Sequence, residues 1–233
     1  MVGLADTFRK GGYDRRMCNH YANDLRKMGR FLGDLIGEQF SETKIPLRFG
    51  NLPTHVYPDR PAMIVRKGEE RWELETMRWG FPSPAPGAPP VTNVRNVDKP
   101  FWKRWLQPET RCLVPATAFA EYDQAPPGQK KEHWFGLPSG EPFLFAGIWR
   151  QWEGTRGTKK APETGLHLLF SFLTAEPNAV VAPIHPKAMP VILNNDEADA
   201  WLTLPADVAL KTFQRPLPDD GLIIVPAPPK EAA

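Results

Sequence analysis

The chain has 233 residues, of which 41% are hydrophobic and 24% charged, and its formal net charge is +2. These values are typical of a globular protein that is long enough to bury a core and short enough to form one domain. No apolar run is long enough to span a membrane, and residues 1–16 lack the apolar stretch of a secretory signal. The small positive charge argues against a protein that binds nucleic acid through many phosphate contacts, so any such contact must be local.

The first part of the chain predicts one helix followed by two strands. Apolar side chains recur at helical spacing over residues 22–38. Proline and asparagine mark residues 49–61 as an irregular loop, after which residues 62–66 and 70–79 predict a β-hairpin. Residues 80–90 contain too many prolines for a regular element, and we expect a surface loop there.

The centre of the chain predicts mainly β-structure. Asp98 as N-cap and Pro100 in the first turn favour a short helix over residues 98–106. Runs rich in valine, leucine, phenylalanine and tryptophan predict strands at residues 111–116, 133–137, 142–152 and 166–174. The polar segments 125–131 and 153–165 between them predict loops, of which the second is basic and expected to be mobile.

The last part of the chain combines short helices with a final strand. We expect helices over residues 176–184 and 194–204, on either side of an apolar run at 189–193. Residues 221–225 predict the last strand, and residues 226–233 a flexible proline-rich tail. The sum is an α+β fold, a single domain with a strongly curled, barrel-like antiparallel β-sheet flanked by helices.

The two cysteines, Cys18 and Cys112, are too few for a disulfide framework, and no spacing typical of a zinc or redox site is present. We therefore expect neither a metal nor another cofactor. Cys112 lies in an apolar strand and is expected in the core. Four histidines show no metal-ligand spacing, namely His20, His55, His133 and His167.

The dipeptide Met17-Cys18 allows an unusual chemistry. If Met17 were the initiator and were removed, Cys18 would carry a free α-amine beside its thiol. The pKa values of such an amine and thiol, about 8 and about 8.5, leave both partly nucleophilic near neutral pH. A terminal 1,2-aminothiol can close a ring on an aldehyde carbon, which an internal cysteine cannot do.

Six motifs in order resemble the SRAP family, the SOS-response-associated peptidase or abasic-site-processing proteins. They are Met17-Cys18, WGFP at 79–82, NVR at 93–95, RCLVPATAFAEYD at 111–123, Leu173-Thr174 and IHPKAMPVIL at 184–193. The resemblance implies an SRAP domain over residues 17–225, preceded by an extension, residues 1–16, that is not native or is removed. Where the family commonly has Gly-Arg after the cysteine, this chain has Asn19 and His20.

The resemblance implies an abasic-site sensor on single-stranded DNA. The Cys18 amine would form a Schiff base with the opened deoxyribose, and the thiol would close a stable thiazolidine that shields the lesion. Asn93 would position the sugar, while Glu121 and His185 would exchange protons during ring opening and imine formation. The residues implied to contact DNA are Arg95, Trp79, Pro58 and Asn19, the first through a phosphate and the tryptophan through a base.

Other interpretations stay open. Cys18 could be the nucleophile of a cysteine peptidase, acting on this chain or on others, with His185 or Glu121 as base. The chain could also be a non-covalent single-strand DNA-binding module. Without the motifs, Asn93, Glu121 and His185 would be ordinary loop or strand-end residues, and Trp79 fits a core position equally well.

The expected setting follows from the same resemblance. It implies an enzyme of the SOS response with peptidase and lyase-like DNA-crosslinking activity. Its partners would be single-stranded DNA with abasic sites and proteins of the replication fork. We expect a monomer with no membrane contact, cytoplasmic and associated with the nucleoid when bound to DNA.

Overall fold

The computed structural model describes residues 18–36, 49, 52–69, 72–83 and 88–230. Its helices are α1 (Leu25–Ile36), α2 (Pro100–Lys103), α3 (Asn195–Thr203) and α4 (Ala206–Phe213). The strands of its larger sheet are β3 (Pro61–Lys67), β4 (Trp72–Trp79), β5 (Asn93–Val94), β6 (Arg111–Ala116), β9 (Phe143–Thr158), β10 (Ala161–Ala175), β11 (Met189–Pro190) and β12 (Ile192–Leu193). The smaller sheet contains β1 (His20–Ala22), β2 (His55–Val56), β7 (Ala118–Tyr122), β8 (Glu132–Gly136) and β13 (Ile223–Val225).

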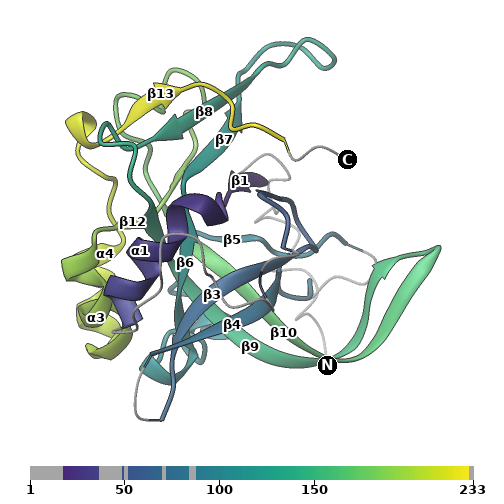
Figure 1. Cartoon of the computed structure of the whole chain (residues 1–233). Coiled ribbons are helices and arrows are strands. Elements are labelled where there is room, and N and C mark those ends of the chain that lie inside the picture. Colours follow the sequence, from purple (N-terminus) through teal and green to yellow (C-terminus); the bar gives the residue numbers. More distant parts are fainter. Residues whose placement is uncertain (1–17, 37–48, 50–51, 70–71, 84–87, 231–233) are drawn as a thin grey trace.

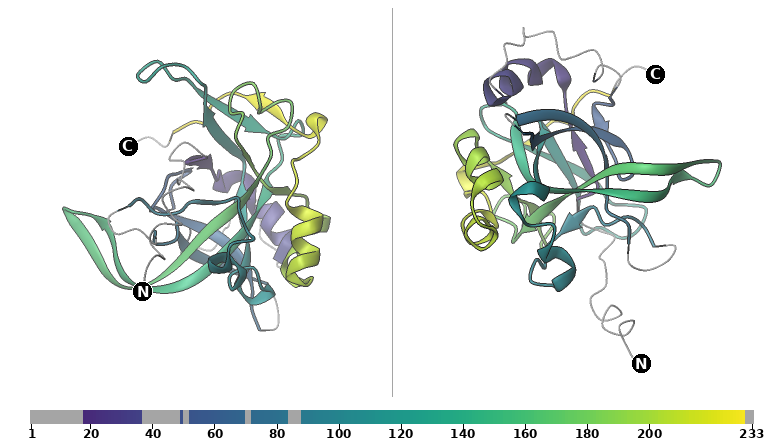
Figure 2. Two further views of the ribbon diagram at one scale, coloured as in Figure 1. Left: turned by 180° about the vertical axis from the view of Figure 1, so that it is seen from behind. Right: turned by 90° about the horizontal axis from the view of Figure 1, so that it is seen from below.

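The larger sheet closes into a barrel. Its pairings run from β10 through β4, β3, β6 and β9 and return to β10, and Figure 2 shows the resulting ring of strands from below. The predicted α+β class and curled sheet are therefore confirmed. The sheet is mixed, however, because β10 lies parallel to both β4 and β5.

The smaller sheet, in the order β13, β8, β7, β1, β2, lies beside the barrel (Figure 1). Alternate side chains of the barrel strands belong to two apolar clusters, as the two-residue period of a strand requires. One cluster includes residues of α1, α3 and α4, and the other includes the inward side chains of the smaller sheet, such as Tyr21 and Phe119. Cys18 belongs to this second cluster.

The segment 153–165, predicted as a mobile loop, forms the outer half of the β9–β10 hairpin, so that prediction is wrong. The two strands pair continuously from Gly147 with Phe172 to Thr158 with Ala161, and the hairpin projects from the barrel in Figure 1. A two-stranded arm that stands away from the core buries little apolar surface, so its sequence lacks the apolar alternation of a strand.

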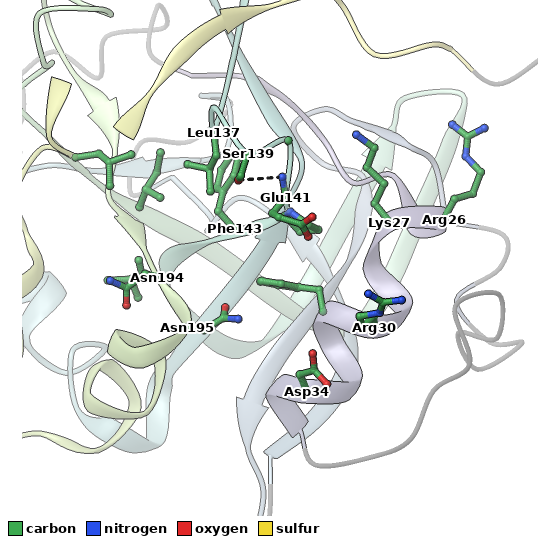
Figure 3. A pocket seen from close by; sticks show the side chains of 16 residues that line it. Arg26, Lys27, Arg30, Asp34, Leu137, Ser139, Glu141, Phe143, Asn194 and Asn195 are labelled. Atoms are coloured by element: carbon green, nitrogen blue, oxygen red, sulfur yellow. Dashed lines mark hydrogen bonds between the residues drawn. The ribbon is translucent and has the colours of Figure 1, made fainter. Parts of the chain in front are cut away.

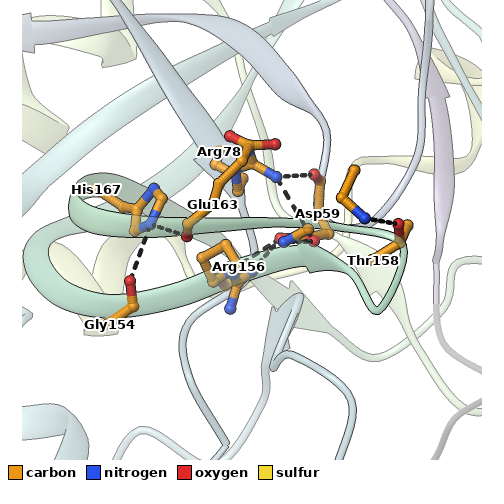
Figure 4. Close-up of polar contacts among 10 residues, drawn as sticks. Asp59, Arg78, Gly154, Arg156, Thr158, Glu163 and His167 are labelled. Atoms are coloured by element: carbon orange, nitrogen blue, oxygen red, sulfur yellow. Dashed lines mark hydrogen bonds and ion pairs between the residues drawn. The ribbon is translucent and has the colours of Figure 1, made fainter.

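This arm is fastened, near its closing turn, to the turn after β2, as Figure 4 shows. The Arg156 side chain donates from Nε to Asp59 Oδ1 over 2.8 Å, and the Gly157 backbone N–H donates to Asp59 Oδ2 over 3.0 Å. Arg156 also donates to the carbonyl oxygen of Gly80, where β4 ends, over 3.0 Å. These contacts connect the arm to the turn that contains Pro58.

Other element predictions also need correction. The predicted helix at 176–184 is wrong, because the described backbone makes only turns over residues 179–184. The segment begins as a helix would, since the Asn178 side chain accepts from the Val181 backbone N–H over 3.1 Å and the Ala182 N–H donates to the Asn178 carbonyl oxygen over 2.9 Å. Pro183 follows and has no N–H with which to continue the helix. The predicted helix over residues 98–106 is confirmed only as the short α2. The end of the predicted helix at residue 38 lies outside the described residues.

Candidate functional site

Cys18 lies directly before β1 and is buried, with 1% of its surface exposed. Its thiol donates to the carbonyl oxygen of His20 over 3.7 Å. Burial raises the pKa of the thiol well above its usual value, and the charge of Glu121 acts in the same direction. The neutral thiol is therefore the favoured form in the folded protein.

Asn93 holds the backbone of Cys18. Its side-chain amide donates to the Cys18 carbonyl oxygen over 2.7 Å and to Thr92 Oγ1 over 2.9 Å. The position of Asn93 is set by β5, which pairs in parallel with β10, Asn93 opposite Phe172. The Asn93 Oδ1 atom is buried and accepts no hydrogen bond from the described part of the chain, so it can accept one from a ligand.

Glu121 and His185 complete the group around Cys18. Glu121 is on β7 with 3% of its surface exposed, and the His185 Nδ1 atom lies 3.6 Å from its Oε2 atom. Burial raises the pKa of Glu121 well above its usual value, although a hydrogen bond from the Cys18 backbone nitrogen partly opposes this. The four residues proposed for the chemistry thus meet at one buried place, and Glu121 binds the nitrogen of Cys18.

Arg95 does not lie free at the surface. Its guanidinium donates to the carbonyl oxygens of Ala175, over 2.7 Å, and Lys187, over 3.1 Å, and pairs with the carboxylate of Glu176. About a quarter of the side chain, 27%, stays exposed. Arg95 therefore joins the end of β10 to the segment before β11, while part of its guanidinium faces solvent.

Comparison with known proteins decides the family. The family model described as SOS response associated peptidase (SRAP) matches residues 17–230. The chain belongs to the SRAP family.

Among SRAP relatives, the abasic site processing protein YoqW of Bacillus subtilis is 30% identical over 155 residues, which cover 64% of this chain and 65% of that protein. The abasic site processing protein YobE of the same organism is 26% identical over 157 residues, covering 64% and 67% of the two chains. The matched region thus spans just under two thirds of the length of YoqW.

Solved structures share the fold of this SRAP chain. A protein from Bordetella bronchiseptica superimposes with a TM-score of 0.66 at 22% identity, covering 90% of this chain and all of that one, 100%. A protein from Bacteroides thetaiotaomicron gives a TM-score of 0.66 at 17% identity, covering 90% and 92%. At these identities the likeness establishes the fold alone.

Two predicted DNA contacts of the SRAP domain, Asn19 and Pro58, are partly exposed. A third, Trp79, is not exposed at all. Its indole N–H donates to the Thr92 carbonyl oxygen over 3.0 Å, and its ring stacks on Phe172 with centroids 5.2 Å apart. Core side chains thus occupy the surroundings of this ring, which gives Trp79 a core position in this structure, and base stacking by its indole stays a prediction.

We expect Trp79→Ala to act on stability. Truncation of a fully buried aromatic side chain costs roughly 3 to 5 kcal/mol of unfolding free energy. Chemical denaturation should show this loss, and variant protein that is still folded should bind single-stranded DNA like the wild type. A normal stability combined with weak DNA binding would contradict the core assignment and restore the stacking role.

A cluster of polar side chains around His20, at the start of β1, was not predicted from the sequence. His20, which stands where the SRAP family commonly has arginine, is buried and cannot reach a phosphate at the surface. Its Nδ1 atom lies 2.7 Å from Glu132 Oε1, and its Nε2 atom lies 2.8 Å from His55 Nδ1. Only the pairing of β1 with β2 and β7 brings these distant residues together, so spacing in the sequence carried no signal.

A cavity of about 790 Å³ lies elsewhere, between α1, the β8–β9 turn and the start of α3. Figure 3 shows Arg26, Lys27 and Arg30 of α1 along one side. Its other lining residues include Phe31 and Phe143. Cys18 and its neighbours do not line it, so this cavity is separate from the candidate site.

The described part of the chain has neither a metal-ligand cluster nor a membrane-spanning helix. No three His, Cys, Asp or Glu side chains within the described ranges lie where they could share a metal ion. Among the described helices, none is long and apolar enough to cross a membrane.

Proposed function

We propose that this SRAP protein senses abasic sites in single-stranded DNA and links itself covalently to them through Cys18. The observation that carries the proposal is that Asn93 and Glu121 both bind the backbone of Cys18, while His185 lies against Glu121. The names of the Bacillus relatives support abasic-site processing as the setting. DNA that contains the lesion is thus the proposed partner.

The proposed reaction begins at the nitrogen of Cys18. An α-amine there adds to the C1′ aldehyde of the opened sugar, and loss of water gives an imine. The thiol sulfur then adds to the imine carbon, and the thiol proton moves to the nitrogen, which closes a thiazolidine. Because burial favours the neutral thiol, the amine is the better first nucleophile.

Glu121 and His185 are placed to move the protons. A carboxyl group with a raised pKa can donate a proton to the leaving hydroxyl and take one from the attacking amine. Glu121 contacts the Cys18 nitrogen, and His185 lies against Glu121. Asn93, which holds the Cys18 carbonyl group, fixes the direction of the nitrogen.

The decisive experiment offers the protein an oligonucleotide with one true abasic site and separates the products by denaturing electrophoresis after heating. A band of protein joined to DNA supports the proposal, and mass spectrometry of the digested adduct should place the bond at Cys18. If DNA is retained only under native conditions, the chain is a non-covalent binding module.

We expect Glu121→Gln to slow adduct formation by roughly a hundredfold or more, the usual contribution of a general acid or base. The same variant should also become more stable relative to the wild type as the pH rises. Burial raises the pKa of Glu121, so the folded protein holds this proton more tightly than the unfolded chain. The wild type therefore has its full stability below the unfolded value of about 4.3 and loses stability as the pH rises towards the folded value.

Glutamine has no proton to lose, so the free energy of unfolding of the variant does not fall through ionisation at this position. The stability difference should grow with pH by at most about 1.4 kcal/mol per pH unit, the limit for one proton. Thermal unfolding of both proteins at about pH 5 and about pH 8 measures it. A variant that reacts at the wild-type rate, or whose stability relative to the wild type does not change with pH, would refute the assigned role.

A cysteine peptidase is the second candidate, because the family description names a peptidase, Glu121 contacts the backbone of Cys18, and His185 lies against Glu121. The raised thiol pKa speaks against it, since peptidase thiols are activated by a lowered pKa. This activity is tested by incubating a chain that keeps residues 1–17 and then measuring its intact mass. If the only cut falls directly before Cys18, the peptidase activity serves to release the Cys18 amine for the reaction with DNA.

A further inference from the structure

Tyr57, in the turn after β2, presents an aromatic ring at the surface. The residue is 41% exposed. One face of the ring stacks on the imidazole of His20, with centroids 4.0 Å apart and planes inclined by 20°. The ring therefore has one face covered by protein, and a large part of the residue remains open to solvent.

The imidazole under Tyr57 is held firmly. Both ring nitrogens of His20 are engaged, Nδ1 by Glu132 and Nε2 by His55. The Trp134 ring meets His20 edge-on, with centroids 4.5 Å apart, and the Trp134 indole N–H donates to Glu132 Oε2 over 3.1 Å. A ring fixed by two hydrogen bonds and a second aromatic contact cannot turn, so Tyr57 rests on a rigid support.

This support adjoins the candidate site. The carbonyl oxygen of His20 accepts the thiol hydrogen bond of Cys18. On the other side, Tyr57 leads into Pro58 and Asp59, and the Asp59 backbone N–H donates to the Trp79 carbonyl oxygen over 2.8 Å. The exposed ring is therefore attached to the same strand end that carries the nucleophile.

We propose that Tyr57 is a stacking platform for one base of the single strand beside the abasic site. This inference rests on the proposed function and adds a contact to it. A pre-ordered aromatic face loses little conformational entropy when a base stacks on it. The carboxylate of Glu132, close to the ring, would repel a phosphate, so the ring faces a base rather than the DNA backbone.

A double-mutant cycle between protein and DNA tests the platform. The probe is an oligonucleotide with a tetrahydrofuran analogue of the abasic site, which has no aldehyde and so allows equilibrium binding to be measured. In a series of such probes, a second tetrahydrofuran replaces one neighbouring nucleotide at a time and removes its base. Each probe is bound to wild type, Tyr57→Ala and Tyr57→Phe.

We expect Tyr57→Ala to weaken binding of the complete probe by about 5- to 150-fold, the range for loss of one stacked base. This loss should disappear on the probe that lacks the one base in contact and persist on the others. Tyr57→Phe should bind like the wild type, because the ring is kept. Ile224→Ala, which removes an exposed apolar side chain from the opposite edge strand of the same sheet, serves as the matched control and should bind normally.

The platform is refuted if Tyr57→Ala binds the complete probe like the wild type, or if its loss is equal on every probe. The trapping assay with a true abasic site separates this failure from failure of the proposed function. If a heat-stable adduct forms but the effect of Tyr57→Ala does not depend on any one base, the Tyr57 proposal is wrong and the proposed reaction stands. If no adduct forms but the effect of Tyr57→Ala depends on one base, the proposed reaction is wrong and the chain has a DNA-binding site that stacks a base.

Discussion

Cys18→Ala is expected to abolish the heat-stable adduct with abasic DNA completely. The alanine variant can still form an imine through its α-amine, but it has no sulfur to close the ring, so heating returns free protein. Cys18→Ser should give at most a weaker adduct, because the hydroxyl is a poorer nucleophile and its ring opens more easily. Denaturing electrophoresis of wild type and both variants, after equal incubation and heating, measures the difference.

DNA binding provides the control for this experiment. Alanine fits the buried space of Cys18 and keeps the backbone groups that contact Asn93 and Glu121. Binding of undamaged single strands should therefore be close to that of the wild type. An undiminished heat-stable band with either variant would show that another nucleophile carries the bond.

Retention of residues 1–17 is expected to prevent the adduct as completely as loss of the thiol. In that protein the Cys18 nitrogen is an amide, which cannot condense with an aldehyde to give an imine. A protein that begins at Met17 and loses this methionine has the amine and should react. This shorter protein still contains the whole region that the family model matches, residues 17–230.

The intact mass of both proteins must be measured before the reaction, because cleavage of the longer chain would free the Cys18 amine during the experiment. In that case the amount of adduct from the longer protein should be proportional to the fraction of it that is cleaved. If the longer protein stays uncleaved by mass and still forms a heat-stable bond through Cys18, the aminothiol mechanism is wrong.

The helices and strands that could be predicted from the sequence are those whose apolar residues repeat with the same period as their buried positions. The helix α1, the strands β3 and β6 and the inner half of β10 carry apolar side chains at the spacing that their burial requires, and this spacing predicted each of them. The outer half of the β9–β10 arm was missed because it has no buried face to impose such a pattern. The helix α4 was not predicted, because its eight residues carry only two buried side chains, Ala209 and Phe213, which are too few for a clear helical period.

The site was predictable only in part, for a different reason. The resemblance of short motifs to the SRAP family identified Cys18, Asn93, Glu121 and His185 as site residues. No local sequence pattern connects residues so far apart in the chain. Trp79 shows the limit of this approach, since a tryptophan at a strand end looks the same in sequence whether it faces the core or a ligand. The contact of His20 with Glu132 and Tyr57 depends on which strands become neighbours, and that is a property of the whole fold.

The burial of Cys18 also has a consequence for the life of the protein in the cell. Aminothiols react with any small aldehyde, and metabolism produces such compounds continually. Cys18 is among the first residues to leave the ribosome, whereas Asn93 and Glu121, which bind its backbone in the folded protein, are synthesised much later. In a nascent chain with a free terminus, the Cys18 aminothiol would thus be able to react with these aldehydes until the barrel closes. Folding, which buries Cys18, would protect it from reaction with an aldehyde other than that of an abasic site.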